Sequence, residues 1–181
     1  MLSRLCLCGM AAALLAPAQE TNQGPAKPSP EHQALVRLAG EYTTATKFFA
    51  KPGDTPLETK GTAKLTSAVD GKILLEEFSG MFLGQTVHGL RLMTYNEAAK
   101  QYEATWTYSL VTGLMTLVGT SKDDGKTIDL TGTYSGENGK KETLYVTTRR
   151  VGADQFVVEL YAKTADGKRA TTMETTYTRK K

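Results

Sequence analysis

Hydrophobic and polar residues alternate along most of this chain. Between residues 127 and 134, Ile, Leu, Gly and Tyr occupy every second position, with threonines and an aspartate between them. The segments 101–108 and 156–161 follow the same rule. Alternation with a period of two is typical of a β-strand that has one buried and one solvent-exposed face.

Short turn signals separate these segments. Asp-Gly and Asn-Gly pairs are the strongest, because a two-residue hairpin turn needs positive φ at both central positions. The turns recur about every fourteen residues, which leaves room for a strand and a tight connection but not for an intervening helix. They lie at Asp70-Gly71, Gly84, Asn96-Glu97, Gly113, Asp124-Gly125, Asn138-Gly139, Gly152-Ala153 and Asp166-Gly167.

One short helix is expected before the strands. Ser29 is a suitable N-cap, and Pro30 fits the first helical position. Leu35 and Leu38 form a small apolar face, and Gly40 is expected to end the helix. A helix of about two turns is too short to be a scaffold, so we expect it to act as a lid or plug.

These elements predict an all-β fold: an antiparallel up-and-down β-barrel of about ten strands with a short N-terminal helix. A meander this long leaves unpaired edges unless it closes on itself. The outer faces carry Thr, Glu, Asp and Lys, whereas an outer-membrane barrel would show an apolar band there. A barrel of this size encloses either packed side chains or one small ligand.

The first residues predict export. Arg4, an apolar run over 5–15 and small residues at 16–18 form the three-part pattern of a secretory signal, and the run is too short to span a bilayer. An apolar helix that stays with the protein is the alternative. The expected organisation is a signal peptide at 1–18, a flexible tether at 19–29 and a single β-barrel domain at 30–181, in a periplasmic or secreted protein.

Composition narrows the function classes. Cleavage after Ala18 removes Cys6 and Cys8, the only cysteines, so the mature chain has no disulfide and no thiolate metal site. It also removes Arg4, which lowers the net charge of +3 by one. The charges are scattered, without the basic stripe that binds nucleic acid. No later segment is apolar enough to predict a membrane-spanning helix.

Aromatic and polar residues of the predicted strands are candidates for lining a cavity. Apolar bodies with a few polar groups are typical of pockets that take small ligands. The candidate pocket residues are Trp106, Tyr108, Tyr95, His88, Glu174 and Tyr177. The leading hypothesis is an exported binding module for a small apolar or amphipathic ligand. The alternative is that side chains fill the barrel and that the protein is a structural or interaction protein; the sequence leaves the oligomeric state open.

His88 carries the hypothesis from another class. It is the only histidine in the predicted strands and shares a face with Leu90 and Leu92, so it is a candidate haem ligand or general base beside Glu76 or Glu174. A hydrogen-bonded core histidine is the simpler interpretation. No nucleophile elbow, P-loop or dinucleotide fingerprint is present, and two histidines are a poor supply of metal ligands. We therefore predict no cofactor and no metal, and an enzyme is the weaker class.

The segment SPEHQALVRLAGEY, residues 29–42, resembles the opening of the bacterial family called domain of unknown function 1579. The similarity extends over about residues 29–179. It includes Gly80 to Gly84, Gly89, Tyr95-Asn96, Thr105-Trp106, Thr112-Gly113, Met173-Glu174 and Thr176 to Thr178. The resemblance implies a lipocalin-like barrel and no activity. Two departures stand out: Tyr108 replaces an expected acidic residue, and Arg91 interrupts the glycine pattern around Gly89.

Overall fold

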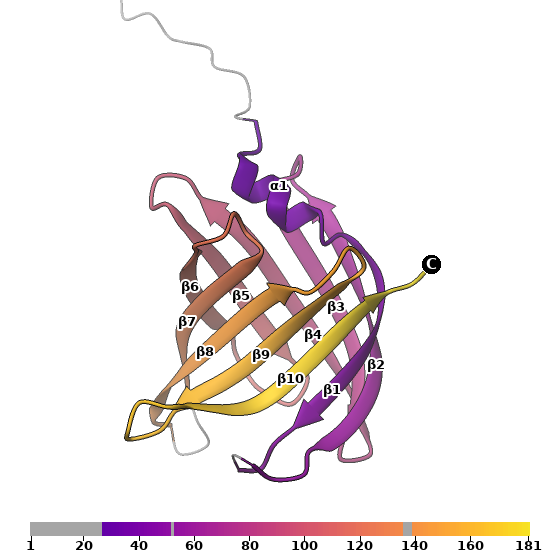
Figure 1. Ribbon diagram of the computed structural model, residues 1–181, viewed down its shortest axis with the longest axis vertical. Coiled ribbons are helices and arrows are strands. Elements are labelled where there is room, and N and C mark those ends of the chain that lie inside the picture. The colour runs from indigo at the N-terminus through magenta and orange to yellow at the C-terminus, as the bar shows by residue number, and fades with distance from the viewer. Residues whose placement is uncertain (1–26, 52, 136–138) are drawn as a thin grey trace, which may run out of the picture.

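The computed structural model describes residues 27–51, 53–135 and 139–181. One helix is followed by ten antiparallel strands that close into a barrel (Figure 1), which confirms the predicted fold class. The predicted signal peptide and most of the tether lie outside the described residues. The elements are α1 (Pro30–Val36), β1 (Gly40–Phe48), β2 (Leu57–Ala68), β3 (Ile73–Phe82), β4 (Gln85–Asn96), β5 (Gln101–Tyr108), β6 (Met115–Ser121), β7 (Thr127–Ser135), β8 (Lys141–Arg150), β9 (Gln155–Lys163) and β10 (Arg169–Arg179).

The first and last strands close the barrel. β1 and β10 pair antiparallel from Tyr42↔Arg179 to Phe48↔Met173, and the other pairs join strands that are neighbours in sequence. Each strand therefore has a hydrogen-bonded neighbour on both sides. A closed sheet of this kind offers no edge to which another chain could add a strand.

Left-handed backbone forms the predicted turns. Asp70 and Gly71 have φ values of 54° and 83°, and Asp124 and Gly125 have 55° and 78°. Leu83, in the β3–β4 turn, also has a positive φ of 48°. Leucine is uncommon in this conformation, whereas glycine and asparagine adopt it readily.

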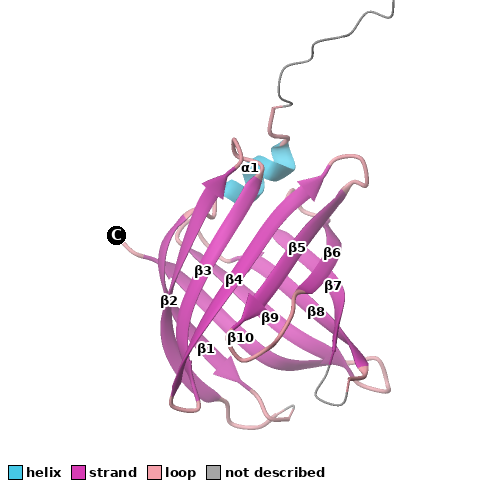
Figure 2. Ribbon diagram, turned by 180° about the vertical axis from the view of Figure 1, so that it is seen from behind, coloured by secondary structure: helices cyan, strands magenta, loops and turns pink. Residues whose placement is uncertain are grey.

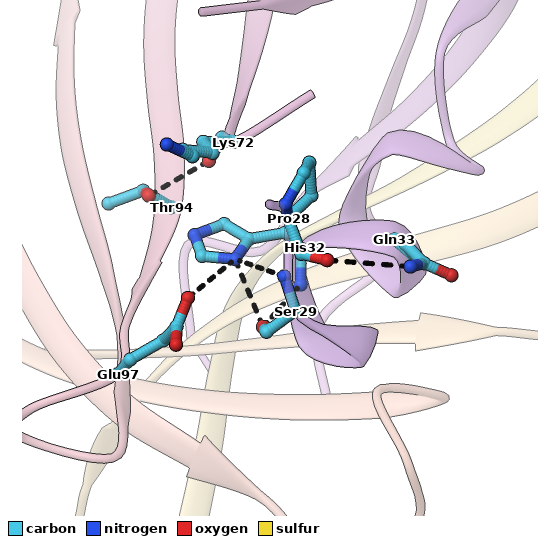
Figure 3. A network of polar contacts seen from close by, with 7 residues as sticks. All are labelled: Pro28, Ser29, His32, Gln33, Lys72, Thr94 and Glu97. Carbon is cyan, nitrogen blue, oxygen red and sulfur yellow. Dashed lines mark hydrogen bonds and ion pairs between the residues drawn. The ribbon is translucent and has the colours of Figure 1, made fainter. Parts of the chain in front are cut away.

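A capping box holds the start of α1. The Ser29 hydroxyl accepts a hydrogen bond from the His32 amide at 3.4 Å, and the Ser29 amide donates to Nδ1 of His32 at 3.2 Å (Figure 3). Pro30 occupies the first helical position, where no amide hydrogen is needed. The predicted N-terminus of the helix is confirmed.

The helix ends earlier than predicted, at Val36 and not at Gly40. Gly40 opens β1 with a φ of 151°, and a Cβ at this position would collide with the guanidinium of Arg179. That guanidinium donates to the carbonyl oxygens of Ala39 at 2.6 Å and Arg37 at 3.1 Å. Arg179, in the last strand, thus supplies hydrogen-bond donors to carbonyl groups at the end of the helix. The residue that satisfies this helix end therefore lies far from it in sequence.

One half of the barrel is filled. α1 lies across one end, as the front and back views show (Figures 1 and 2). Leu35 of α1 is 1% exposed and belongs to the same apolar cluster as the inward side chains of the strands beneath it. The most buried of these include Tyr42, Leu74, Met93, Leu117, Ile128 and Phe156. The helix is therefore the plug that its length and apolar face predict.

The strands run from this filled half into a hollow one. Along β5, the inward side chains of Tyr102 and Ala104 belong to the buried cluster. Trp106 and Tyr108, the next inward residues, line a cavity instead. The alternation predicted for this strand is therefore correct, and its two ends serve different purposes.

Candidate functional site

A cavity of about 730 Å³ occupies the half of the barrel away from α1. Its mouth lies at the end of the barrel that carries the β3–β4 and β5–β6 connections. The rings of Phe48 and Phe82 lie 4.8 Å apart near this mouth. Much of the remaining wall is apolar and includes Phe78, Val87, Val158, Leu160 and Met173. A pocket of this size and lining suits a small ligand with a large apolar part.

Trp106 and Tyr108 form an aromatic side of the cavity. Their ring centroids lie 6.0 Å apart, with the planes inclined by 48°. Burial raises the pKa of Tyr108, so its hydroxyl stays neutral and can donate or accept a hydrogen bond. Trp106 is the only tryptophan of the chain, so its fluorescence reports on this cavity alone.

A buried polar cluster lies at the inner end of the cavity. Glu76 on β3 and Arg91 on β4 are cross-strand partners, and Nη2 of Arg91 lies 2.5 Å from Oε2 of Glu76. The Tyr177 hydroxyl, from β10, donates to Oε1 of Glu76 at 2.6 Å. All three are at most 5% exposed and line the cavity. These are the deepest lining residues of their strands, next to the filled half.

The cluster has a fixed protonation pattern at two of its members. Burial alone would lower the pKa of Arg91, but Glu76 beside it raises that pKa above its usual value. Burial and the neighbouring Glu76 carboxylate raise the pKa of Tyr177 well above 10. Arg91 is therefore a cation and Tyr177 a neutral donor over the physiological pH range. An ion pair this deep costs desolvation, so it is weak evidence for stability and better evidence for a specific role.

Arg91 has hydrogen-bonding capacity that Glu76 does not use. A guanidinium carries five N–H groups in a rigid fork. Among the described residues, the Glu76 carboxylate is the only acceptor paired with the Arg91 guanidinium. Because Arg91 lines the cavity, its remaining N–H groups can donate to a polar group placed there. Oxygen acceptors, and above all carboxylates, fit such a donor best.

His88 lies outside the barrel, so the prediction that its imidazole enters the cavity is wrong. On β4 the inward residues are Val87, Gly89 and Arg91, and His88 is exposed on the outer face. Leu90, which shares the face of His88, is also 41% exposed. His88 borders a shallow outer cleft, and the haem or general-base hypothesis inside the barrel has no support from this geometry.

The remaining candidates divide between the cavity, the filled half and the surface. Tyr177 lines the cavity with Trp106 and Tyr108. Tyr95 points inward but packs in the filled half, with its ring 5.0 Å from that of Tyr102. Glu174 is wrong as a pocket residue, because β10 pairs with β1 so that its neighbours Met173 and Thr175 point inward.

Ser29, His32 and Glu97 lie together at the closed end and superficially resemble a hydrolase triad (Figure 3). The Ser29 hydroxyl lies 3.0 Å from Nδ1 of His32, and Oε1 of Glu97 lies 3.8 Å from the same nitrogen. A catalytic histidine needs its two partners on different ring nitrogens. His32 is also 4% exposed at the plugged end, away from the cavity mouth. The cluster is therefore a helix cap.

No group of three or more His, Cys, Asp or Glu among the described residues is arranged to hold a metal ion. None of the helices within these residues is long and apolar enough to cross a membrane.

Comparison with known proteins places the chain in a family. A family model described as "Protein of unknown function (DUF1579)" matches residues 27–179. The S-type phycobiliprotein lyase CPES from Guillardia theta is similar in structure, with 14% sequence identity, a TM-score of 0.57, and coverage of 87% of this chain and 99% of the lyase. A redesigned β-barrel has 13% identity, a TM-score of 0.44, and coverage of 86% and 100%. No curated protein matches. At these identities the likeness to the lyase shows the lipocalin-like fold alone.

Proposed function

Because the chain belongs to the DUF1579 family, whose description assigns no activity, we propose a function from the cavity: the protein binds a small amphipathic molecule inside the barrel. The apolar part of the ligand lies against the cavity wall around Trp106. Its polar end carries an oxygen acceptor, a carboxylate in the best case, and lies at Arg91. The proposal is for a binding protein and includes no catalytic step.

The observation that carries this proposal is the position of Arg91 at the inner end of an apolar cavity. A barrel filled by side chains would need no charge there, and a cavity that only held water would need no apolar wall. The combination fits a ligand with one polar end. The ligand enters with this end first, because the polar group lies deepest and the apolar residues continue to the mouth.

Trp106 fluorescence tests the proposal directly. Dodecanoate, dodecanol and dodecyltrimethylammonium share one apolar chain and differ in the polar end. We expect a saturable change of Trp106 emission with dodecanoate, weaker binding of dodecanol, and no saturable binding of the ammonium compound. A hydrogen bond to a charged group contributes about 1.5–3 kcal/mol, so dodecanoate should bind at least about tenfold more tightly than dodecanol.

Variants assign the binding to Arg91. Removing this residue alone leaves Glu76 buried without its partner, so the double variant Arg91→Met with Glu76→Gln is the informative one. It keeps the side-chain volumes and should remove the preference for dodecanoate. Arg149→Ala, an arginine replaced on the exposed face of β8, is the matched control. Equal affinity for all three amphiphiles, or no response from any of them, would contradict the proposal.

We further propose that the binding protein works outside the cytoplasm. The support is the signal-like pattern of residues 1–18, which lie outside the described residues. Intact-mass measurement of the protein recovered from periplasm and medium checks this. A mass that corresponds to a chain starting at Gln19 is expected, and an uncleaved chain found only in the cytosol would contradict it.

A further inference from the structure

The two ends of the barrel present different surfaces. Turns at the α1 end carry charged residues such as Asp70, Lys100 and Asp124, with two exposed valines, Val69 and Val151, among them. At the open end, residues 81–86 and 109–114, which include the β3–β4 and β5–β6 connections, contain no charged residue. They expose large apolar side chains instead: Leu83 (73% exposed), Leu114 (69%), Leu110 (47%), Met81 (42%) and Val111 (36%). Exposed apolar residues gathered at one end mark an interaction surface.

This apolar surface is continuous with the cavity. Leu110 and Val111 are exposed to solvent and also line the cavity. They follow Trp106 and Tyr108 along the chain, so apolar side chains run from the interior through the mouth to Leu114 at the surface. A molecule that moves along this path keeps its apolar part covered until it reaches the outer surface.

We infer that the open end of the barrel docks on a lipid bilayer, with the β3–β4 and β5–β6 loops inserted among the lipids and the cavity mouth facing the membrane. Leu83 and Leu114 are the main inserted side chains. The docking does not depend on a ligand. That the docked barrel exchanges its amphipathic ligand with the bilayer rests on the proposed function.

The charges near this end fit a shallow position at the interface. Exposed lysines in the neighbouring connections and at the adjoining strand ends have long side chains whose charged ends can remain in the headgroup region. They are Lys51, Lys140, Lys141, Lys163 and Lys168. Asp54, Glu142 and Asp166 lie among them, so the charge is mixed. The apolar loops therefore supply most of the binding, and anionic lipids strengthen it only modestly.

A bilayer suits this surface better than a protein partner does. The exposed leucines are carried by two separate connections, and Leu110 and Val111 in one of them also line the cavity. A rigid partner would have to match both connections and the cavity mouth beside them. A fluid bilayer accommodates loop tips in any arrangement, and it is also where molecules with one apolar and one polar end collect.

The chain offers a matched pair of positions for the test. Leu83 at the open end and Val69 at the α1 end are both exposed apolar residues in hairpin turns, with φ values of 48° and 49°. Asparagine tolerates this conformation better than either residue. Leu83→Asn and Val69→Asn therefore make the same kind of change without threatening the fold.

Vesicle flotation with the full protein measures the docking. The vesicles are phosphatidylcholine alone and phosphatidylcholine mixed with phosphatidylglycerol. We expect the protein to float with both, somewhat more with the anionic mixture. Leu83→Asn combined with Leu114→Ser should lower the partition coefficient about tenfold or more, since two exposed leucines no longer enter the lipid. Val69→Asn should leave it unchanged.

Several outcomes would overturn the inference. One is no flotation with either vesicle. A second is an equal loss from Val69→Asn, and a third is binding that needs anionic lipid and ignores the leucine substitutions. A fourth is a dimer in sedimentation velocity that the leucine substitutions abolish, which would assign the surface to a second copy of the chain. Dodecanoate titration of the leucine variant separates the two proposals, because Trp106 should still respond after vesicle binding is lost.

Discussion

At the scale of single residues, the most informative group is the buried cluster of Glu76, Arg91 and Tyr177. Two opposite charges lie inside the barrel, where burial is costly, and the guanidinium of Arg91 lines the cavity with N–H groups that Glu76 does not use. Tyr177, from a strand distant in sequence, fixes the orientation of the carboxylate. The cluster is therefore preorganised before any ligand arrives, which lowers the entropic cost of binding.

Substitutions in this pair should separate charge balance from packing. Arg91→Ala leaves the Glu76 carboxylate buried without its cation, and we expect a loss of about 3–5 kcal/mol in the free energy of unfolding. Arg91→Met with Glu76→Gln removes both charges and should leave stability unchanged or raise it. Urea unfolding followed by circular dichroism measures both. A double variant as unstable as the single one would show that the ion pair itself stabilises the fold.

The tyrosines predict how stability depends on pH. Burial raises the pKa of Tyr102 to about 12 and that of Tyr177 well above 10, whereas in the unfolded chain both ionise near about 10. A raised pKa in the folded state means that the folded protein holds these protons more tightly. The stabilisation is complete below about pH 10 and is lost as the pH rises toward about 12 and beyond.

The measurement is the urea midpoint as a function of pH, with tyrosinate absorbance recorded in parallel. The midpoint should fall above about pH 10, and the buried tyrosines should ionise together with unfolding. In Tyr102→Phe the fall should be smaller. A midpoint that falls equally in this variant would assign the alkaline loss to other groups.

At the scale of elements, the strands and turns were predictable but the facing of β4 was not. β4 has apolar residues on both faces, so Leu90 and Leu92 made the outer face resemble the inner one, and period-two counting placed His88 inside the barrel with them. Glu174 was a candidate for the polarity of its carboxylate. In β10, a period of two that starts at Tyr177 runs through Thr175 and Met173, which line the cavity, and leaves Glu174 on the outer face.

The same ambiguity explains why Arg91 was missed as a site residue. The sequence marks it only as an interruption of a glycine pattern. A second signal was present: Glu76, in the preceding strand, is an acidic residue among inward apolar positions. Only the register Glu76↔Arg91 brings the two together, and register depends on turn geometry along the whole hairpin. Tyr177 joins them through barrel closure, which no local pattern encodes.

The helix cap gives a prediction at this scale. Ser29→Ala removes the hydroxyl that accepts from the His32 amide, and we expect a loss of about 1 kcal/mol in the free energy of unfolding. Ser67→Ala, at an exposed position near the end of β2, is the control and should change little. The Trp106 response to dodecanoate should be the same in both, because α1 lies at the end opposite the cavity mouth. A weaker response in Ser29→Ala would show that the plug reaches the site.

At the scale of the whole molecule, closure brings the two ends of the barrel chain together. The Lys180 amide donates to the carbonyl oxygen of Glu41 at 2.8 Å, so the end of β10 lies beside the start of β1. The order of strands around the barrel follows their order in the chain. The fold therefore has no position at which the chain must begin.

A circular permutant tests this. Joining Lys181 to Lys27 through a Gly/Ser linker and opening the chain at Asp166-Gly167 keeps all strand pairs, so we expect a folded protein with unchanged dodecanoate binding. Deleting residues 169–181 removes β10 and exposes the edges of β1 and β9, and this variant should aggregate. Gel filtration and circular dichroism distinguish the two. A permutant that fails to fold would show that folding depends on where the chain starts.

The division of each strand into a packed half and a hollow half has an evolutionary consequence. Many side chains of the packed half, such as Tyr42, Leu74 and Leu117, do not line the cavity, while Phe82 and Tyr108 line it without belonging to the apolar cluster. Trp106, Val158 and Tyr177 take part in both. Under the proposed function, substitutions at the outer positions can alter which molecule is preferred while the apolar cluster beneath α1 keeps the fold intact. This partial separation makes the scaffold a practical starting point for engineered receptors.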